Sequence, residues 1–414
     1  MTREMKNSGV RWIGDIPSNW GMSKFKAEGS VLSGFPFNSE KFTSDTGFPL
    51  IRIRDITSGQ AGTFYDGDYP TSYIIHDGDF LLGMDGEFNV RWWQGGDALL
   101  NQRCCRLSLN NKFFAKYIFY LIPFGLKLIN DLAYSTTVKH LSVPDILNLS
   151  LLVPPLNEQK AIAEFLDEKC GEIDKLLADL DSEVKTLAEY KKSLIAETVT
   201  RGLNPNVPMK SSGMPWADTI PAHWEKDKGK FRFELRKTKG NPRNLELMSP
   251  TQKYGVIPQS QLEGVVLVKE NTDLNSFRTI RKGDFCISLR SFQGGFEFSN
   301  YEGVVSPAYQ VFYPTKPIAE GYFKYVFKSD GFISYINTFS MSLRDGKNIA
   351  FEDFGNSYIP MPPLSEQKAI ADFLDTKCAA IDQAIADKTT QIETLKAYKS
   401  SLIYEYVTGK KQVL

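Results

Sequence analysis

The sequence contains PPLNEQKAIAEFLDEKC at Pro154–Cys170 and nearly the same stretch, PPLSEQKAIADFLDTKC, at Pro362–Cys378. An ungapped alignment of residues 154–200 with residues 362–408 gives 28 identities in 47 positions. Self-similarity at a fixed distance along a chain is the signature of a repeated architecture. We therefore expect two halves built on one plan, each ending in this stretch.

The repeated stretch predicts a long helix in each half. Apolar residues recur at steps of four and three, which is the heptad pattern of a helix that packs on a partner helix. The expected contact positions are Leu166, Ile173, Leu177, Leu180, Leu187, Leu374, Ile381, Ile385, Ile392 and Leu395. Lys191, Lys388 and Lys399 interrupt this pattern. Each helix would be about 65 Å long, and a two-fold relation between the halves would make the helices antiparallel.

The segment before each helix predicts a globular domain of mixed α and β structure. Both segments open alike, with GVRWIGDIPSNW at 9–20 and GMPWADTIPAHW at 213–224. Short β-rich runs predict strands, namely IRIRD at 51–55, EGVVLV at 263–268 and YQVFYP at 309–314. Aromatic residues at helical spacing predict helices, namely FFAKYIFYLI at 113–122 and YFKYVFKSDGFISYI at 322–336.

These patterns together predict an α+β protein. Two α/β globular domains in a pseudo-two-fold arrangement would be separated by two long antiparallel helices that form a coiled coil. The predicted segments are a first domain at 1–153, a central helix at 154–203, a second domain at 204–361 and a C-terminal helix at 362–414.

Composition indicates a globular protein of the cytoplasm. Hydrophobic residues make up 42% and charged residues 24% of the 414 residues, and no apolar run is long enough to cross a membrane. Five cysteines without a C-x-x-C pair fit a reducing compartment. The net charge is zero, although residues 204–361 carry 20 basic and 16 acidic side chains, which weakly favours a polyanionic partner.

Motifs for catalysis are missing from the sequence. It has no G-x-x-x-x-G-K-[ST] loop and no N/D-P-P-Y/F motif of adenine methylation. Pro144-Asp145 and Glu158-Gln159-Lys160 give the outline of a nuclease motif, but a Pro-Pro break separates the two carboxylates that would have to share a metal. His76, His140 and His223 lack metal-ligand spacing. We predict a non-catalytic chain without a metal site.

The repeated PPLxEQxxIAxFLD text, the G-x-x-W-x-x-x-I-P-x-x-W opening and the tandem order resemble the DNA-specificity (S) subunit of type I restriction-modification systems. The resemblance implies that two target-recognition domains each read half of a split target in double-stranded DNA, and that the helices set the gap. It further implies two modification subunits that use S-adenosylmethionine. In the complete enzyme, restriction subunits that use ATP with magnesium would join them.

Residues that read different half-sites should differ between the halves while staying in frame. After a shared Gly-Asp-Phe strand, the candidate readers are Asp85, Glu87 and Asn89 in the first half and Arg290, Ser291 and Gln293 in the second. Arginine suits guanine, asparagine and glutamine suit adenine, and carboxylates accept from cytosine. The alternative is that these loops diverge without any function.

A second group of candidates lies just before each helix. It comprises Thr136, Lys139 and His140 in the first half and Arg344, Lys347 and Asn348 in the second. Lys139 and Lys347 occupy equivalent positions, as expected of contacts with phosphate, although solvated surface lysines would look the same. Arg52 and Arg54 share one face of their predicted strand and could face DNA or pair with a nearby carboxylate.

Two other functional classes compete with DNA reading. A non-catalytic coiled-coil scaffold could present two variable protein- or glycan-binding domains, and the zero net charge is compatible with this alternative. A self-contained enzyme is disfavoured by the missing motifs.

Overall fold

The computed structural model describes residues 3–132, 139–240, 245–262, 274–288, 295–339 and 349–413. The chain forms two compact units, of which unit 1 comprises Met1–Leu180 with Thr390–Leu414 and unit 2 comprises Asp181–Thr389. Each unit therefore takes in part of each predicted long helix, and the predicted domain limits stay a prediction.

Unit 1 is built mainly from short strands. These are β1 (Met5–Asn7), β2 (Asp15–Pro17), β3 (Gly21–Lys24), β4 (Gly29–Ser33), β5 (Phe42–Thr43), β6 (Phe48–Ile51), β7 (Phe64–Tyr65), β8 (Ile74–Ile75), β9 (Phe80–Gly83), β10 (Val90–Trp92), β11 (Ala98–Leu100), β12 (Cys104–Leu109) and β13 (Ser150–Val153). They form a four-stranded sheet in the order β10-β9-β12-β4, a five-stranded sheet in the order β5-β7-β6-β11-β8, and the pairs β1-β2 and β13-β3.

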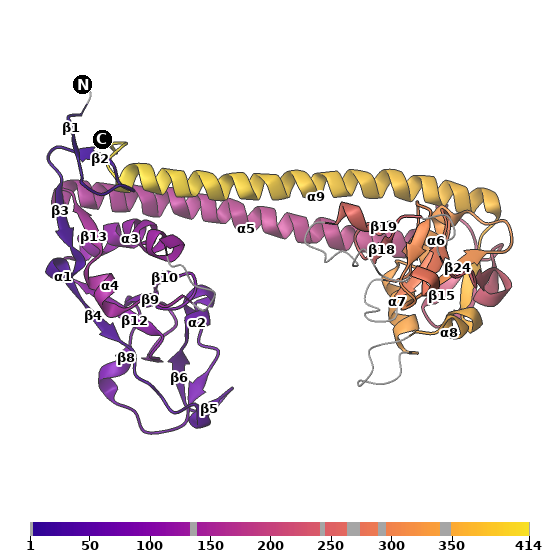
Figure 1. Cartoon of the computed structure of the whole chain (residues 1–414), viewed down its shortest axis with the longest axis horizontal. Helices are drawn as coiled ribbons and strands as arrows, with labels where there is room; N and C mark the ends of the chain where they lie inside the picture. The colour runs from indigo at the N-terminus through magenta and orange to yellow at the C-terminus, as the bar shows by residue number, and fades with distance from the viewer. Residues whose placement is uncertain are drawn as a thin grey trace. The chain divides into compact units, whose positions relative to one another are not determined.

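Helices pack against the four-stranded sheet and the β13-β3 pair (Figure 1). They are α1 (Phe25–Glu28), α2 (Ile53–Ser58), α3 (Lys112–Leu132) and α4 (Val143–Leu147), with 3-10 turns η1 (Ser39–Lys41) and η2 (Thr71–Tyr73). Helix α3 confirms the helix predicted at 113–122. Its buried residues Tyr117 and Leu121 pack with Trp20 and Phe80 in the main core of the unit.

The strand predicted for IRIRD at 51–55 is wrong. Strand β6 ends at Ile51, and α2 begins at Ile53. The cause is local, because the Asp55 carboxylate accepts hydrogen bonds from the backbone N–H of Arg52 at 2.8 Å and of Gly62 at 3.2 Å. An acidic residue that bonds the first free N–H groups of a helix stabilises that helix start.

Unit 2 repeats the plan. Its strands are β14 (Met209–Met214), β15 (Ala217–Pro221), β16 (Glu225–Lys228), β17 (Phe233–Leu235), β18 (Met248–Thr251), β19 (Gly255–Pro258), β20 (Arg278–Ile280), β21 (Phe285–Ser288), β22 (Glu297–Phe298), β23 (Gly303–Val305), β24 (Tyr309–Pro314) and β25 (Tyr358–Met361). The sheet order β22-β21-β24-β17 repeats the order β10-β9-β12-β4. Strand β24 confirms the strand predicted for YQVFYP, while EGVVLV lies outside the described residues.

The shorter helices of unit 2 are α6 (Glu320–Val326), α7 (Asp330–Asn337) and α8 (Phe351–Asn356), with 3-10 turns η3 (Gly229–Phe231), η4 (Gln259–Gln261) and η5 (Leu274–Ser276). Helices α6 and α7 confirm the helical prediction for residues 322–336.

The two predicted long helices are present as α5 (Leu156–Arg201) and α9 (Leu364–Val407). In unit 1 the first turns of α5 lie beside the last turns of α9, and Phe165 contacts Tyr406 with ring centroids 4.5 Å apart. In unit 2 the last turns of α5 lie beside the first turns of α9, and Val199 shares a core with Leu374. The helices are therefore antiparallel within each unit (Figure 1).

The predicted contact positions of these helices are all shielded from solvent. Leu166, Ile173, Leu374, Ile381 and Ile392 are buried, and Leu177, Leu180, Leu187, Ile385 and Leu395 are half-buried. None of the ten positions is exposed, as the heptad pattern predicts, while their individual contacts across the helix pair stay a prediction.

The lysines that interrupt the heptads form ion pairs between the helices. Lys191 pairs with Asp382 in unit 2, and Lys399 pairs with Asp174 in unit 1, each at 2.6 Å. These two pairs are equivalent in the aligned repeats. Lys388 adds an ion pair with Glu183 in unit 2. The same lysine–aspartate contact between α5 and α9 thus occurs once in each unit.

Among the described residues, no helix is long and apolar enough to span a membrane.

Candidate nucleic-acid interface

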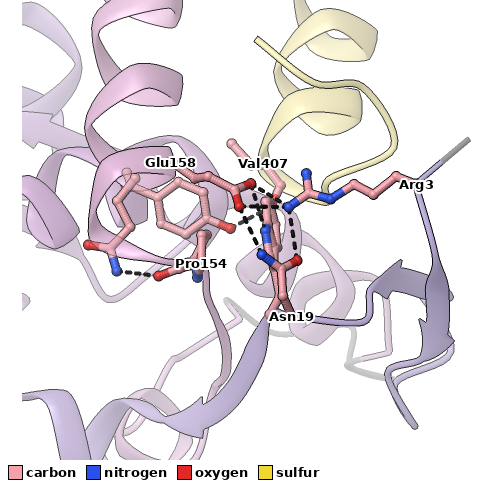
Figure 2. A network of polar contacts seen from close by, with 8 residues as sticks. Arg3, Asn19, Pro154, Glu158 and Val407 are labelled. Carbon is pink, nitrogen blue, oxygen red and sulfur yellow. Dashed lines mark hydrogen bonds and ion pairs between the residues drawn. The ribbon is translucent and has the colours of Figure 1, made fainter. Parts of the chain in front are cut away.

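The repeated PPLxEQ text fastens a globular region to a long helix in each unit. Trp20 Nε1 donates to the Glu158 carboxylate at 2.9 Å, and Trp224 Nε1 donates to Glu366 at the same distance. In unit 1 Arg3 and Asn19 also donate to Glu158, at 2.5–2.7 Å and 3.1 Å (Figure 2). Burial alone would raise the pKa of Glu158, but these hydrogen bonds outweigh it and lower the pKa.

The glutamine of the repeated text donates a hydrogen bond to the carbonyl of the first proline in each Pro-Pro pair. Gln159 Nε2 donates to the Pro154 carbonyl at 2.7 Å (Figure 2), and Gln367 Nε2 donates to the Pro362 carbonyl at 2.9 Å. Both glutamines are buried. These residues are repeated because they hold backbone and core in place, so the repeated text is a framework rather than a reading site.

A buried tyrosine in each unit bonds the end of a long helix. Tyr117 Oη donates to the Val407 carbonyl at 2.5 Å, and Tyr322 Oη donates to the Val199 carbonyl at 2.8 Å. The last carbonyls of a helix have no partner within it, so these hydroxyls satisfy them. Burial raises the pKa of both tyrosines well above the ordinary value, which keeps each hydroxyl a donor.

The aspartate of FLD is the acceptor of a third repeated contact. Asp167 accepts from Tyr120 at 2.7 Å and Lys116 at 3.0 Å. Asp375 accepts from Tyr325 at 2.6 Å and from Lys324 at 3.0 Å. The tryptophan, glutamine, tyrosine and aspartate contacts each have an equivalent in the other unit. His223, which aligns with Asn19, lies 2.7 Å from Glu366, whereas Lys116 and Lys324 occupy different positions of the aligned halves.

The structure brings two groups of predicted readers together in unit 1. Leu141 N donates to the Met84 carbonyl at 2.7 Å, and Gly86 N donates to the Lys139 carbonyl at 3.1 Å. This short antiparallel contact places the Asp85 carboxylate 2.6 Å from Nδ1 of His140. The loop after β9 and the segment before α4 therefore form one surface.

Sequence reasoning missed a residue at this surface, Arg103. Its Nε lies 3.5 Å from Asp85 Oδ2, and its Nη1 lies 3.4 Å from His140 Nδ1. The aligned halves contained a signal, because Arg103 immediately precedes β12 whereas Ala308 immediately precedes the equivalent β24. This difference lies in the turn before β12, outside the two loops whose candidate residues differ between the halves.

Other predicted readers of unit 1 lie around this surface. Glu87 is exposed in a turn next to Phe88, which has a φ of 51° and is buried. Asn89 is exposed and donates to Thr57 Oγ1 at 3.4 Å. Lys139 Nζ donates to the Asn130 carbonyl at 2.6 Å, so this lysine stabilises the end of α3. Its predicted contact with phosphate stays a prediction.

Arg52 and Arg54 contact a different set of residues. Arg52 lies over the Phe42 ring, 5.8 Å from its centroid. Arg54 lies 3.6 Å from the Asp55 carboxylate and donates to Thr63 at 2.7 Å. Arg54 therefore forms the ion pair that was one of the two alternatives for these arginines. Arg52 and Arg54 do not share a strand face, because β6 ends at Ile51.

The remaining predicted readers fall outside the described residues and stay predictions. They are Thr136, Arg290, Ser291, Gln293, Arg344, Lys347 and Asn348.

The two carboxylates of the nuclease outline serve other purposes. Asp145 accepts from the Ser142 backbone at 3.0 Å and caps α4, while Glu158 accepts the tryptophan indole. Each histidine lies beside a carboxylate, at 2.6 Å for His76 with Asp97 and 2.7 Å for His223 with Glu366. Within the described ranges, no group of three His, Cys, Asp or Glu side chains could hold a metal ion.

Comparison with known proteins gives one consistent result. The type I restriction modification DNA specificity domain matches residues 17–185 and again 228–394. The specificity subunit of the type I restriction enzyme EcoBI of Escherichia coli is 25% identical, over 98% of this chain and 91% of the relative. The putative MjaX specificity subunit of Methanocaldococcus jannaschii is 24% identical, over 97% of this chain and 96% of the relative.

A solved chain from a study of complex assembly and conformational transition in the type I R-M system has the same fold. It has a TM-score of 0.67 at 15% identity and covers 96% of this chain and 99% of its own length. The family match spans both halves of the sequence and confirms the resemblance. The chain belongs to the type I restriction-modification DNA specificity family, with two specificity domains in tandem.

Proposed function

We propose that this chain is the subunit that gives a type I restriction-modification complex its DNA sequence preference, by reading a target in two separated parts. Each of the two recognition domains would read one half-site. The observation that carries the proposal is the contrast within each repeat: the same docking contacts recur, while the loops after β9 and β21 differ in every candidate reader.

In this proposal the surface formed by the β9 loop and the segment before α4 faces one half-site. Its polar side chains are of the types that bond base edges in the major groove. The loops at 289–294 and 340–348 would serve the second half-site, on the strength of their place in the aligned sequence.

The proposal assigns no catalysis to this chain. Two modification subunits would supply methylation with S-adenosylmethionine, and restriction subunits would supply cleavage with ATP and magnesium. The duplicated framework supports two copies of a partner, because a repeated surface offers the same contacts twice. Since the target is cellular DNA, the proposed place of action is the cytoplasm.

We further propose that α5 and α9 set the gap between the half-sites. Both helices run without a break through more than forty residues, and reciprocal ion pairs fix their register. One turn of DNA spans about 34–36 Å, so the gap would depend on where along the helices each domain is docked.

The scaffold alternative, with protein- or glycan-binding domains, has less support. It accounts for the coiled coil, but it gives no reason for the match of both halves to a DNA specificity family.

Methylome sequencing of cells with and without the gene tests the proposal. We expect one split adenine-methylation motif to vanish when the gene is deleted and to return with a plasmid copy. As a control, a plasmid copy with both helix-docking tryptophans replaced, W20A with W224A, should not restore it. An unchanged methylome in a strain whose partner subunits are expressed would overturn the proposal.

A further inference from the structure

Three charged or polar side chains converge at the surface where the two predicted loops of unit 1 meet. Asp85, Arg103 and His140 come from the loop after β9, the turn before β12 and the segment before α4. Their backbones are joined, because Met84 N donates to the Arg103 carbonyl at 2.9 Å and Leu141 N donates to the Met84 carbonyl at 2.7 Å. Segments far apart in sequence are thus held in one fixed arrangement.

The geometry assigns the central role to Asp85. An ionised carboxylate only accepts hydrogen bonds, so the 2.6 Å contact requires His140 to carry a proton on Nδ1. Arg103 also only donates, so it cannot bond that same nitrogen. The Asp85 carboxylate is therefore the group that holds both neighbours, with His140 on Oδ1 and Arg103 beside Oδ2.

The exposed fraction of the side chain differs between Asp85 and its two neighbours. The Asp85 side chain is 15% exposed, whereas Arg103 is 52% exposed and His140 is 48% exposed. A carboxylate in this position is occupied and shielded, while the guanidinium reaches solvent. Arg54 and Arg91 differ from Arg103, because their guanidinium groups donate to backbone carbonyls of the domain itself.

We propose that Arg103 reads a guanine in the half-site of the first recognition domain, and that Asp85 is the positioning residue that aims it. The planar guanidinium presents parallel N–H donors that match O6 and N7 of guanine in the major groove. In this proposal Asp85 positions Arg103, in place of the direct contact with cytosine that is expected of a carboxylate. This inference rests on the proposed DNA-reading function.

The test uses the complete methyltransferase complex and a DNA library in which each half-site is randomised. Arg103→Ala should lower the preference for guanine at one position of one half-site by about 10- to 100-fold, which is the usual worth of a bidentate arginine contact. Arg103→Lys should keep overall binding and lose most of the same preference, because lysine lacks the fork. The other half-site should be unaffected.

Asp85→Asn tests the positioning role, since it keeps the size of the side chain and removes the charge. We expect a smaller loss at the same guanine position. Arg11→Ala is the control, because it removes an exposed arginine of unit 1 that is not among the candidate readers. It should leave the preference at every position unchanged.

Two results would overturn the inference while leaving the proposed function intact. One is an unchanged base preference in the folded Arg103→Lys complex. The other is a uniform loss of affinity for all sequences with a salt slope lower by about one, which marks a phosphate contact. A wild-type complex without any base preference would instead overturn the proposed function itself. If Arg103→Ala fails to fold, Arg103→Lys decides.

Discussion

Units 1 and 2 share their polar docking contacts and differ in the apolar interior. In unit 2 a dense group of phenylalanines fills the core, and Phe312 and Phe327 stand where unit 1 has Leu107 and Ile122. Apolar interiors tolerate exchange when overall volume and pattern are kept. Buried polar groups do not, because each donor lost leaves an acceptor unsatisfied. The domains can thus diverge while the frame that holds them stays the same.

The largest effect is expected from shortening one long helix and leaving the other unchanged. Deleting four residues of α5 near Ala178 shortens the helix by about 6 Å between Asp174 and Lys191. The α9 partners Lys399 and Asp382 keep their spacing, so only one of the two ion pairs can form. We expect either failed assembly or an altered gap, measured by binding to DNA targets with graded gaps.

The matched control is a double deletion, with a further four residues removed near Ala386. This removal shortens the spacing between Asp382 and Lys399 by the same amount, so both pairs can form again. The double variant should assemble and prefer a shorter gap than wild type. Retention of the original gap at full activity by the single deletion would refute the role proposed for the helices.

The docking tryptophans should be equivalent in energy. Trp20→Ala and Trp224→Ala each remove a fully buried indole and its bond to the helix glutamate, at a cost of about 3–5 kcal/mol. Hydrogen exchange in residues 156–170 and 364–378 measures the local opening free energy in each unit. Trp92→Ala, a half-buried change on β10, should leave the first of these segments protected. Clearly unequal losses would mean that the two frames are not energetically alike.

A smaller effect is expected at the reciprocal ion pairs. The lysines are mostly shielded but the aspartates are exposed, so each pair should contribute about 0.5–1 kcal/mol. Double-mutant cycles of Lys191 with Asp382 and of Lys399 with Asp174, followed by denaturant unfolding, should give similar coupling energies. A coupling energy near zero in one unit only would show that this ion pair does not hold the helices of that unit in register.

The smallest expected effect is a change in the pH at which unit 1 loses the stabilising contact of Glu158. The folded-state pKa of Glu158 is lowered, so its contribution to stability is present above the ordinary value of about 4.3 and is lost as the pH falls through the folded value. Arg3→Ala removes a hydrogen bond that lowers this pKa, so protection of residues 156–170 should be lost at a higher pH. Lys6→Ala, an exposed change on β1, is the control. Equal acid profiles for both variants would show that Arg3 does not stabilise the Glu158 carboxylate.

The long helices could be predicted because their signal is repeated and periodic. Burial at Leu166, Ile173, Leu374 and Ile381 follows directly from heptad spacing. The lysine interruptions also carried information, since the aligned repeats place Lys191 and Lys399 in equivalent positions. The aspartates that pair with these lysines could not be predicted without the register of the antiparallel helices.

The surface that contains Asp85 and His140 was predictable in part. Comparing the halves in frame found Asp85 and His140, and the structure brings them together. It could not reveal that Asp85 is occupied by its neighbours, because that depends on contacts across 55 residues of sequence. The strand prediction at Arg52 failed for the opposite reason, since a single local cap at Asp55 outweighed an alternating pattern.

The bond between Tyr117 and the Val407 carbonyl has a consequence for biosynthesis. Unit 1 combines Met1–Leu180 with Thr390–Leu414, and Leu402 and Val407 are buried in its core. During translation, the globular region of unit 1 must wait until α9 has been made before its interior closes. A nonsense mutation that removes the last turn of α9 would therefore strip packing from residues that were translated long before it.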